Sequence, residues 1–363
     1  MKRVLVFGMT DMPGGVESVI MNYYRNINRD ELQMDFLCNT PTVAYEEEIK
    51  RLGGKIYKIE SRSKNLFLYH KQLKNFFKEN AKKYSTIWVN ICSLANIDYL
   101  IYAKKYKIKY RIIHCHNSQN MDSKLRVILH KFNKLRLEKY ATDYWTCSEE
   151  SNSWFFQPKL NEKVVVVHNA IDYDKFKFDE DIREEYRKKL KIEDKVVFGN
   201  IGRFHFQKNQ LRLLEIFKKI SEKEENAVLI LIGDGEDKSK ILNKISELKL
   251  EEKVKVLGIR DDVEKLLQCM DAVIFPSLFE GLPLVLVEAQ ANGLPVFASD
   301  TITKEIMLSD NMVFLSLKES NEYWAERILE SNLERHNNYN EIEKKGYDIK
   351  KVCNKIERLL LRK

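Results

Sequence analysis

The chain has 363 residues, of which 44% are hydrophobic and 32% are charged, and its formal net charge at pH 7 is +8. A chain of this length and balance is expected to be a soluble globular protein of two or three domains. It has no apolar run near the ~18 residues that a membrane-spanning helix needs, and its six cysteines include no CxxC pair. The sequence therefore favours a reducing, cytoplasmic compartment and argues against a disulfide or zinc framework.

The positive charge is compatible with a nucleic acid, an anionic membrane or an anionic substrate as partner. The sequence contains no RNA-recognition signature, no zinc-finger spacing, no Walker A motif and no GxGxxG. A nucleic-acid binder is thus indicated by charge alone, and we expect no nucleic-acid partner.

Apolar, strand-like runs alternate with helix-prone stretches along the chain. They form a first series at 3–9, 34–39, 86–90, 110–117, 143–148 and 163–169, and a second at 195–203, 226–235, 253–258, 271–277 and 294–300. Such alternation predicts parallel sheets covered by helices on both faces. A charged, helix-prone stretch (179–192) separates the two series, and two helices are predicted after them, at 322–338 and 346–363. We therefore predict an α/β protein of two doubly wound domains, with a ligand site between them beyond the carboxyl ends of the strands.

Two strands of the first series are followed by residues suited to a ligand site. MPGGVES places Gly14 and Gly15 before a predicted helix, where glycine lets a ligand approach the backbone. A plain tight turn would look the same. HCHN places His114 and His116 on one face of a strand. A core histidine fits His114, whereas the position of His116 at the strand end favours a role in the cleft.

In the second series, GRFHFQKNQ carries Arg203 and Lys208 in a loop between a strand and a helix. Together the two cations would neutralise a diphosphate, with arginine binding it bidentately and lysine acting as a point charge. Two solvated surface cations are the alternative.

The stretch FEGLPLVLVEAQANGLP (279–295) predicts a loop followed by a helix. Pro283 fits the first helical turn, Leu284–Ala291 contains no helix breaker, and Gly293 fits the position just past the end. Glu280 then lies in the loop, and Glu288 lies about one and a half turns into a largely apolar helix. A buried carboxylate there needs hydrogen-bond donors, unless Glu280 caps the helix and Glu288 is partly solvated.

The backbone N–H groups of Leu282, Leu284 and Val285 fall at this helix start, where intrahelical partners are missing and anions bind readily. Cations, free N–H groups and a carboxylate for sugar hydroxyls together describe a site for a nucleotide-diphosphate sugar. Its phosphates would meet Arg203 and Lys208, and its ribose would donate to Glu288.

These residues resemble the retaining GT-B glycosyltransferases of family 4, in particular bacterial enzymes of capsular polysaccharide, exopolysaccharide or O-antigen synthesis. The resemblance covers essentially the whole chain. It is strongest in GRFHFQKNQ, in VLGIRDDVEKLLQCMDAVIFPS and in FEGLPLVLVEAQANGLPVFASD, where seven residues separate the two glutamates.

The resemblance implies an acceptor-binding Rossmann-like domain over 1–175, a donor domain over 176–345, and a helix over 346–363 that packs back on the first domain. Catalytic roles would fall to Glu280, His116, Arg203 and Lys208. Donor binding would fall to Gly15, Arg203, Lys208, Arg260, Glu280, Gly281, Leu282, Leu284, Val285 and Glu288. In this scheme Glu280 contacts the sugar, Glu288 the ribose, and Arg260 the base.

The implied reaction moves a hexose or N-acetylhexosamine from a nucleotide-diphosphate sugar, by family frequency a UDP-sugar, to a glycan acceptor. No cofactor and no metal are implied, although Asp172–Asp174 and Asp179–Asp181 have the Asp-x-Asp spacing of metal-dependent glycosyltransferases. A nucleotide-sugar epimerase of the same fold and an inactive nucleotide-sugar-binding protein are the alternative functions.

Two stretches of the first half, 61–84 and 124–140, mix lysines with large apolar residues. A basic amphipathic helix is typical of a membrane-surface element, while an ordinary packed helix with a solvated lysine face gives the same pattern. The first interpretation predicts a peripheral protein on the inner face of the cell membrane, with a polyprenyl-linked acceptor.

Overall fold

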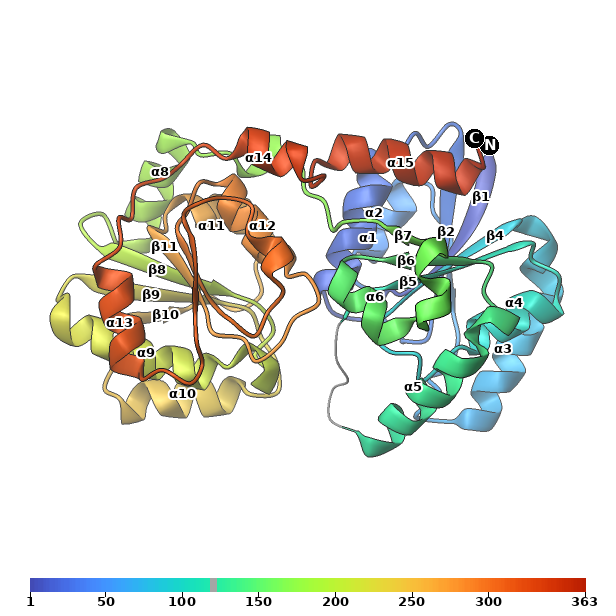
Figure 1. The fold of residues 1–363 in the computed structure, drawn as a ribbon, viewed down its shortest axis with the longest axis horizontal. Helices are drawn as coiled ribbons and strands as arrows, with labels where there is room; N and C mark the ends of the chain where they lie inside the picture. Colours follow the sequence, from blue (N-terminus) through green and yellow to red (C-terminus); the bar gives the residue numbers. More distant parts are fainter. Residues whose placement is uncertain (118–122) are drawn as a thin grey trace. The chain divides into compact units, whose positions relative to one another are not determined.

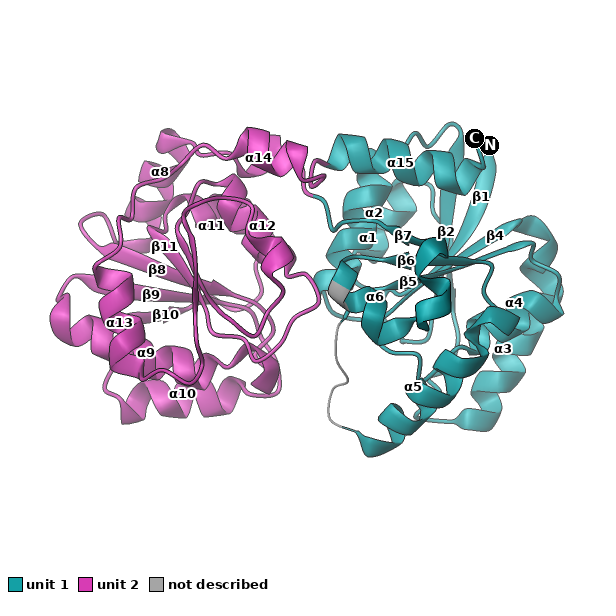
Figure 2. Ribbon diagram, viewed as in Figure 1, with its two compact units in different colours: residues 1–170, 349–363 teal, residues 171–348 magenta. Residues whose placement is uncertain are grey.

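The computed structural model describes residues 1–117 and 123–363. The chain divides into two compact units, Met1–Ala170 with Ile349–Lys363, and Ile171–Asp348 (Figure 2). The sequence-based boundaries are 175/176 and 345/346, and those of the structure are 170/171 and 348/349. Each unit has a parallel sheet with helices on both sides (Figure 1), so the predicted pair of Rossmann-like domains is confirmed.

The described part of the first unit forms a seven-stranded sheet in the order β3-β2-β1-β4-β5-β6-β7. Its strands are β1 (Lys2–Phe7), β2 (Leu32–Cys38), β3 (Ile56–Lys58), β4 (Thr86–Ile91), β5 (Tyr110–Cys115), β6 (Asp143–Thr146) and β7 (Val164–Val166). Its helices are α1 (Gly15–Asn26), α2 (Glu46–Arg51), α3 (Leu66–Asn80), α4 (Asp98–Lys105), α5 (Lys124–Arg136), α6 (Glu149–Phe155) and α15 (Ile349–Leu361). All seven residues of β2 are buried, as expected for a strand covered on both faces.

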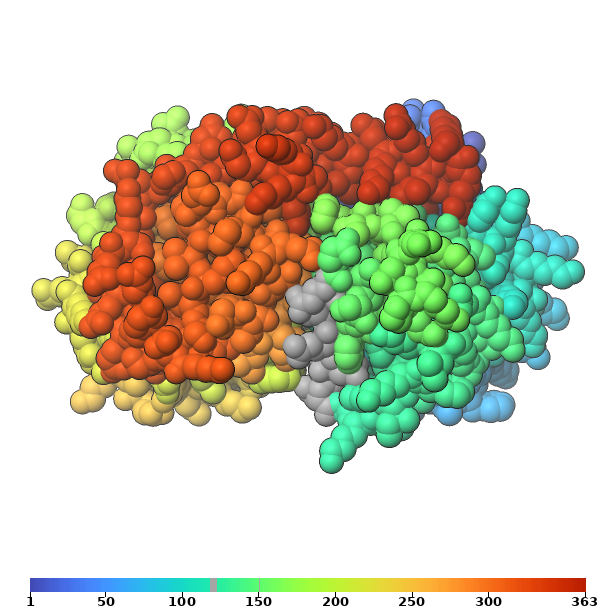
Figure 3. Space-filling view, in the orientation of Figure 1, coloured from blue at the N-terminus to red at the C-terminus, as the bar shows by residue number. Residues whose placement is uncertain are grey.

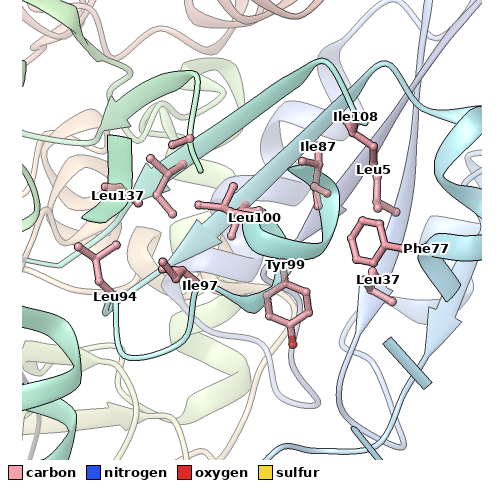
Figure 4. Packing of buried hydrophobic residues seen from close by; sticks show 14 of the residues in the cluster. Leu5, Leu37, Phe77, Ile87, Leu94, Ile97, Tyr99, Leu100, Ile108 and Leu137 are labelled. Carbon is pink, nitrogen blue, oxygen red and sulfur yellow. The ribbon is translucent and has the colours of Figure 1, made fainter. Parts of the chain in front are cut away.

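One hydrophobic cluster of the first unit lies between this sheet and helices α3 and α4. Leu5 and Ile87 project from the strands toward Phe77 of α3 and toward Tyr99 and Leu100 of α4 (Figure 4). Close packing of large side chains of this kind fixes the positions of the strand ends.

The second unit has a six-stranded sheet in the order β10-β9-β8-β11-β12-β13. Its strands are β8 (Val196–Ile201), β9 (Ala227–Ile232), β10 (Val254–Val256), β11 (Ala272–Phe275), β12 (Val296–Ser299) and β13 (Met312–Leu315). Its helices are α7 (Tyr173–Phe176), α8 (Glu180–Leu190), α9 (Gln210–Lys223), α10 (Lys238–Glu247), α11 (Val263–Gln268), α12 (Leu284–Ala291), α13 (Asn321–Leu329) and α14 (Tyr339–Lys344). Phe217 of α9 and Trp324 of α13 are fully buried in its core.

The strand order reverses between β1 and β4 in the first unit and between β8 and β11 in the second. Ligands of doubly wound sheets bind beyond the carboxyl ends of strands at such points. Gly15 at the start of α1 follows β1, and the loops that carry Lys208 and Glu280 follow β8 and β11. The topology therefore places the predicted motifs where this fold binds ligands.

The predicted helix over 322–338 is wrong in its second half, because α13 ends at Leu329. The chain beyond it is held by hydrogen bonds to other parts of the second unit instead of by a helical turn. His336 N–H donates to the Gly293 carbonyl at 3.0 Å, and the Arg335 guanidinium donates to the carbonyls of Gln268 and Met270 at 2.8 and 2.6 Å. Two edge strands, β3 and β13, were not predicted; neither is fully buried, so the apolar pattern that marks the inner strands is weaker there.

Helix α15 belongs to the first unit although it ends the chain. Its stripe of Ile349, Val352, Ile356 and Leu360 is buried, and its outer face remains on the surface of that unit (Figure 3). Among the described residues, no helix combines the length and the apolar character needed to cross a bilayer.

Candidate functional site

Two loops of the second unit, those after β8 and β11, are joined by three hydrogen bonds. Leu278 N–H donates to the Gln207 carbonyl at 2.8 Å, and the Gln207 side-chain amide donates to the Phe279 carbonyl at 2.8 Å. The Asn209 amide donates to the Pro276 carbonyl at 3.1 Å, from a residue whose φ of 56° is the left-handed conformation that asparagine tolerates. The two loops therefore form one rigid ledge at the end of β8 and β11.

The ledge brings Lys208 and Glu280 together. The Lys208 ammonium lies 2.7 Å from the Glu280 carboxylate and 4.8 Å from the centre of the Phe275 ring. Both side chains are largely buried, with 19% and 9% of their surface exposed. An ion pair at this depth holds each charge in one place. An anion that arrives at the ledge therefore meets a fixed ammonium group.

Glycines let the neighbouring strand ends pack closely against this ledge. A Cβ on Gly233 would lie 2.0 Å from the Gly202 carbonyl oxygen, and one on Gly202 would lie 3.2 Å from the Lys208 side chain. Gly233 has a φ of 144°, a conformation that other residues rarely adopt. The glycines of GNIGR and IGDGED thus allow the backbones at Gly202 and Gly233 to pack closely, and Gly202 leaves room for the Lys208 side chain.

Arg203 is placed differently from Lys208. Its side chain is 65% exposed, and its guanidinium lies 3.0 Å from the Glu236 carboxylate. The same carboxylate lies 3.4 Å from the His205 ring. Glu236 and His205 could not be predicted from the sequence, because their contact depends on the loop that follows the neighbouring strand β9. Arg203 therefore stands at the solvent-facing side of the ledge, held by a carboxylate.

The predicted helix with Glu288 is confirmed as α12, which runs from Leu284 to Ala291. Pro283 is its N-cap residue, and the proline side chain makes no capping hydrogen bond to the first N–H groups. Gly293 follows the helix with a φ of 80°, and Leu294 N–H donates to the Ala289 carbonyl, as in a Schellman ending. The N-terminal N–H groups of α12 thus begin directly after the loop of Glu280, which makes them available to an anion.

Glu288 lies in α12 with its carboxylate in an unfavourable environment. The described residues offer this carboxylate no hydrogen bond or ion pair, although the side chain keeps partial exposure. Burial, with a smaller effect of the nearby Glu264 carboxylate, raises the pKa of Glu288 to about 7. A carboxylate that is unsatisfied in the unliganded protein is suited to accept hydrogen bonds from ligand hydroxyls.

Arg260 is already occupied by protein groups. Its guanidinium donates two hydrogen bonds to the Asp262 carboxylate, at 2.8 and 2.6 Å, and the Tyr186 hydroxyl donates to the same group at 2.8 Å. Hydrogen bonding from Arg260 lowers the pKa of Asp262 to about 2. The arginine is therefore fixed in place and presents only its remaining surface to a ligand.

In the first unit, Gly15 is the first residue of α1 and is exposed. A Cβ built on Gly15 would meet no atom of the described residues within 4 Å, whereas one on Gly14 would lie 2.7 Å from the Glu17 carboxylate. Gly14 is thus constrained by the protein itself, and Gly15 borders open space at a helix start.

His116 is buried at the end of β5, where one ring nitrogen lies 2.9 Å from the Asn90 side-chain oxygen. Its ring centre is 4.1 Å from that of His114, which is also buried. Burial lowers the pKa of His116 to about 3, so its ring is neutral near pH 7. A neutral ring favours a role for His116 as a hydrogen-bonding group over a role as a proton carrier. Asn90, the partner that orients the ring, was missed in the sequence because it lies on another strand.

The two Asp-x-Asp pairs do not form a metal cluster in the described structure. The Asp179 carboxylate accepts a hydrogen bond from Ile182 N–H at 3.1 Å as the cap of α8, and Asp172 lies 3.9 Å from Lys175. No group of three or more histidine, cysteine or acidic side chains among the described residues is arranged to hold a metal ion.

Comparison with known proteins identifies the family. The family model for glycosyl transferases group 1 matches residues 182–348. The glycosyltransferase EpsF of Bacillus subtilis is 33% identical over 341 residues, which span 90% of this chain and 87% of EpsF. An alpha-1,3-galactosyltransferase of Escherichia coli is 33% identical over 142 residues, 38% of this chain and 37% of that enzyme.

Among solved structures, HepE of Anabaena in complex with UDP-glucose superimposes with a TM-score of 0.81 over the whole of both chains, at 18% identity. Sucrose-phosphate synthase of Thermosynechococcus elongatus gives a TM-score of 0.78 at 15% identity over 100% of this chain and 99% of that one. These likenesses establish the fold. The chain belongs to the group 1 glycosyltransferases and has the two Rossmann-like domains of the GT-B fold.

Proposed function

We propose that this protein is a retaining glycosyltransferase of the family 4 type that uses a UDP-sugar as donor. The observation that carries the proposal is the constellation on the second unit: the Lys208–Glu280 pair, the start of α12 after Pro283, and the Glu288 carboxylate, which no described residue pairs. In this arrangement the diphosphate binds at Lys208 and the α12 N–H groups, and Arg203 covers it from the solvent side. The ribose hydroxyls donate to Glu288, and Glu280 receives the sugar.

The chemistry proposed for this site is transfer on one face of the sugar. The bond between the anomeric carbon and the diphosphate oxygen breaks, and the acceptor oxygen forms its bond on the same side. The departing phosphate oxygen takes the acceptor proton. Negative charge develops on that phosphate, so Lys208, Arg203 and the helix start accelerate the step by stabilising it. These groups supply the charge that a metal ion would otherwise provide, and we propose that no metal is required.

His116 has a supporting part in this scheme. Because burial lowers its pKa to about 3, its ring is neutral near pH 7 and would serve a bound sugar as a hydrogen-bonding group. Gly15 offers the N–H of a helix start to a phosphate or to the acceptor. Both residues belong to the first unit, to which we assign acceptor binding.

The acceptor proposed here is a glycan on a lipid carrier, used in the synthesis of a bacterial surface polysaccharide. The E. coli relative is named for a diphosphoundecaprenol-linked acceptor, and a relative from Erwinia amylovora, 35% identical over 115 residues, is named for amylovoran biosynthesis. HepE was solved with UDP-glucose bound. These names support a UDP-sugar donor and a lipid-linked acceptor. A lipid-linked acceptor would be reached from a peripheral position on the cytoplasmic face of the membrane, which we propose for this protein.

Thermal unfolding with UDP, GDP, ADP and CMP, each in EDTA and then in Mg²⁺, tests the donor site. A nucleotide at ~100 times its dissociation constant stabilises the protein by about 2.7 kcal/mol. We expect UDP to act in EDTA and Glu288→Ala to abolish its effect. A shift that requires Mg²⁺ would contradict the metal-free scheme, and no shift with any nucleotide would contradict the donor site.

Two product analyses test the reaction. NMR of the anomeric proton in the product should show the configuration of the donor, and inversion would refute the retaining mechanism. Incubation with UDP-sugar alone should leave the sugar unchanged, because conversion to its epimer without any acceptor would identify an epimerase.

A further inference from the structure

Helix α5 presents its apolar side chains outward. Leu125, Ile128, Phe132 and Leu135 have exposed fractions of 64%, 63%, 54% and 70%. Their spacing of three, four and three residues places them on one face of the helix. Four large apolar side chains in one exposed row form a continuous patch, which marks an interaction surface more often than scattered single residues do.

The inner face of α5 is held by polar side chains. Asn133 donates to the Leu94 carbonyl at 2.7 Å, and the His130 ring accepts from Leu94 N–H at 3.2 Å. The other His130 nitrogen lies 3.3 Å from the Trp154 carbonyl. Both His130 and Asn133 are buried. These directional bonds fix the rotation of the helix, so its apolar face is turned away from the unit by the fold itself.

Cations border the exposed row, and α5 contains no carboxylate. The helix KLRVILHKFNKLR carries five cations, and the helical spacing places Lys124, Lys131 and Arg136 beside the row. The Lys134 ammonium instead donates to the Ser153 and Trp154 carbonyls at 2.9 Å on the inner side. The Arg136 guanidinium lies 5.1 Å from the Phe132 ring centre, at the edge of the row. The surface is therefore apolar along its middle and positive at its borders.

Helix α3, the other basic amphipathic stretch, behaves as an ordinary packed helix. It buries Tyr69, Leu73, Phe76 and Phe77. Leu66 and Phe67 of its first turn are exposed. The two stretches look alike in sequence, and only α5 turns its apolar face outward.

We propose that the outer face of α5 docks on an anionic lipid bilayer. The four apolar side chains would enter the boundary between headgroups and acyl chains, and Lys124, Lys131 and Arg136 would reach the anionic headgroups. A second copy of this chain is a poorer occupant, because pairing two α5 faces would bring like charges together with no carboxylate between them. The proposal deepens the proposed lipid-linked acceptor by assigning the membrane contact to one helix.

Flotation of the purified full-length chain with lipid vesicles tests this surface. Vesicles of phosphatidylcholine alone are compared with vesicles that contain phosphatidylglycerol, without donor or acceptor. The test variants are Ile128→Ser/Phe132→Ser, which removes apolar area, and Lys124→Glu/Lys131→Glu, which reverses charge. The matched control is Leu242→Ser/Tyr323→Ser, which changes two residues that are also exposed, on helices of the second unit.

We expect wild type and the control to float with the anionic vesicles and to be released by high salt. Each test variant should lose binding by at least about tenfold, given the apolar area and the charges removed. Equal binding to neutral and anionic vesicles, or unchanged binding by Ile128→Ser/Phe132→Ser, would overturn the proposal. A wild-type dimer that becomes a monomer in this variant would do so as well, because the face would then bind a second copy.

UDP-induced stabilisation, measured on the same samples, separates this result from the proposed function. The α5 variants should keep the full response to UDP, because α5 lies in the first unit and the donor site in the second. Loss of flotation with an intact UDP response supports the docking surface. A missing UDP response in the wild type contradicts the donor site. The flotation result still decides the docking surface, because flotation is measured without donor or acceptor.

Discussion

Replacing Glu288 by glutamine should stabilise the unliganded protein while removing its response to nucleotide. Burial and the Glu264 carboxylate raise the pKa of Glu288 from 4.5 to about 7. A carboxyl group whose pKa is higher in the folded state costs stability as pH rises from about 4.5 to about 7, because the unfolded chain releases its proton first. At 1.36 kcal/mol per pH unit the full difference is about 3.4 kcal/mol. Since the side chain is partly exposed, we expect about 2 kcal/mol.

Scanning calorimetry of the full chain at pH 5 and pH 8 measures this effect. In a unit of this size, about 2 kcal/mol should raise the transition that contains the second unit by about 4–8 °C at pH 8, and by much less at pH 5. Glu264→Gln should give a smaller gain in the same direction, because it removes only the like charge. Glu252→Gln, at an exposed position on the same unit, is the matched control and should show no pH-dependent change.

The nucleotide response completes this test. UDP should stabilise wild type and Glu264→Gln, and it should leave Glu288→Gln largely unchanged. A variant no more stable than wild type at pH 8, or equally stabilised at pH 5 and pH 8, would refute the assignment of the cost to an ionised Glu288. Full UDP stabilisation of Glu288→Gln would refute its contact with the ribose.

Lys208→Ala should lower the free energy of unfolding by about 3 kcal/mol, because it removes the cationic partner of the buried Glu280 carboxylate. In urea unfolding, adding Glu280→Gln should restore much of that loss without restoring transfer activity, and additive losses of the two substitutions would contradict the ion pair. Glu236→Gln should free Arg203 from a surface ion pair and so tighten UDP binding about two- to fivefold, as measured by titration calorimetry. Weaker UDP binding by this variant would contradict the prediction and would mean that Glu236 positions the arginine. The free energy of unfolding should fall by about 2 kcal/mol between pH 6.5 and pH 4.5 on account of buried His116, because its pKa is about 3 in the folded protein and 6.5 in the unfolded chain. The stability of His116→Asn should therefore decrease less with acid, and a pH profile identical to that of wild type would contradict this.

The amino-acid sequence by itself was sufficient for the alternation of strands and helices and for the limits of α12. These depend on local signals: apolar runs, Pro283 before the helix and Gly293 after it act through the backbone conformations of neighbouring residues. Motif spacing also placed Lys208 and Glu280 at strand ends, and parallel topology brings such ends together at one edge of a sheet.

Contacts between distant residues were decided only by the tertiary structure. The Lys208–Glu280 ion pair and the Glu236 carboxylate at Arg203 join loops from different strands, which no local pattern encodes. The same holds for the two basic amphipathic helices, because the direction of an apolar face depends on the neighbours that the fold supplies. α3 meets the core with its aromatic residues, whereas α5 meets the loop at Leu94 with a histidine and an asparagine and leaves its apolar row outside.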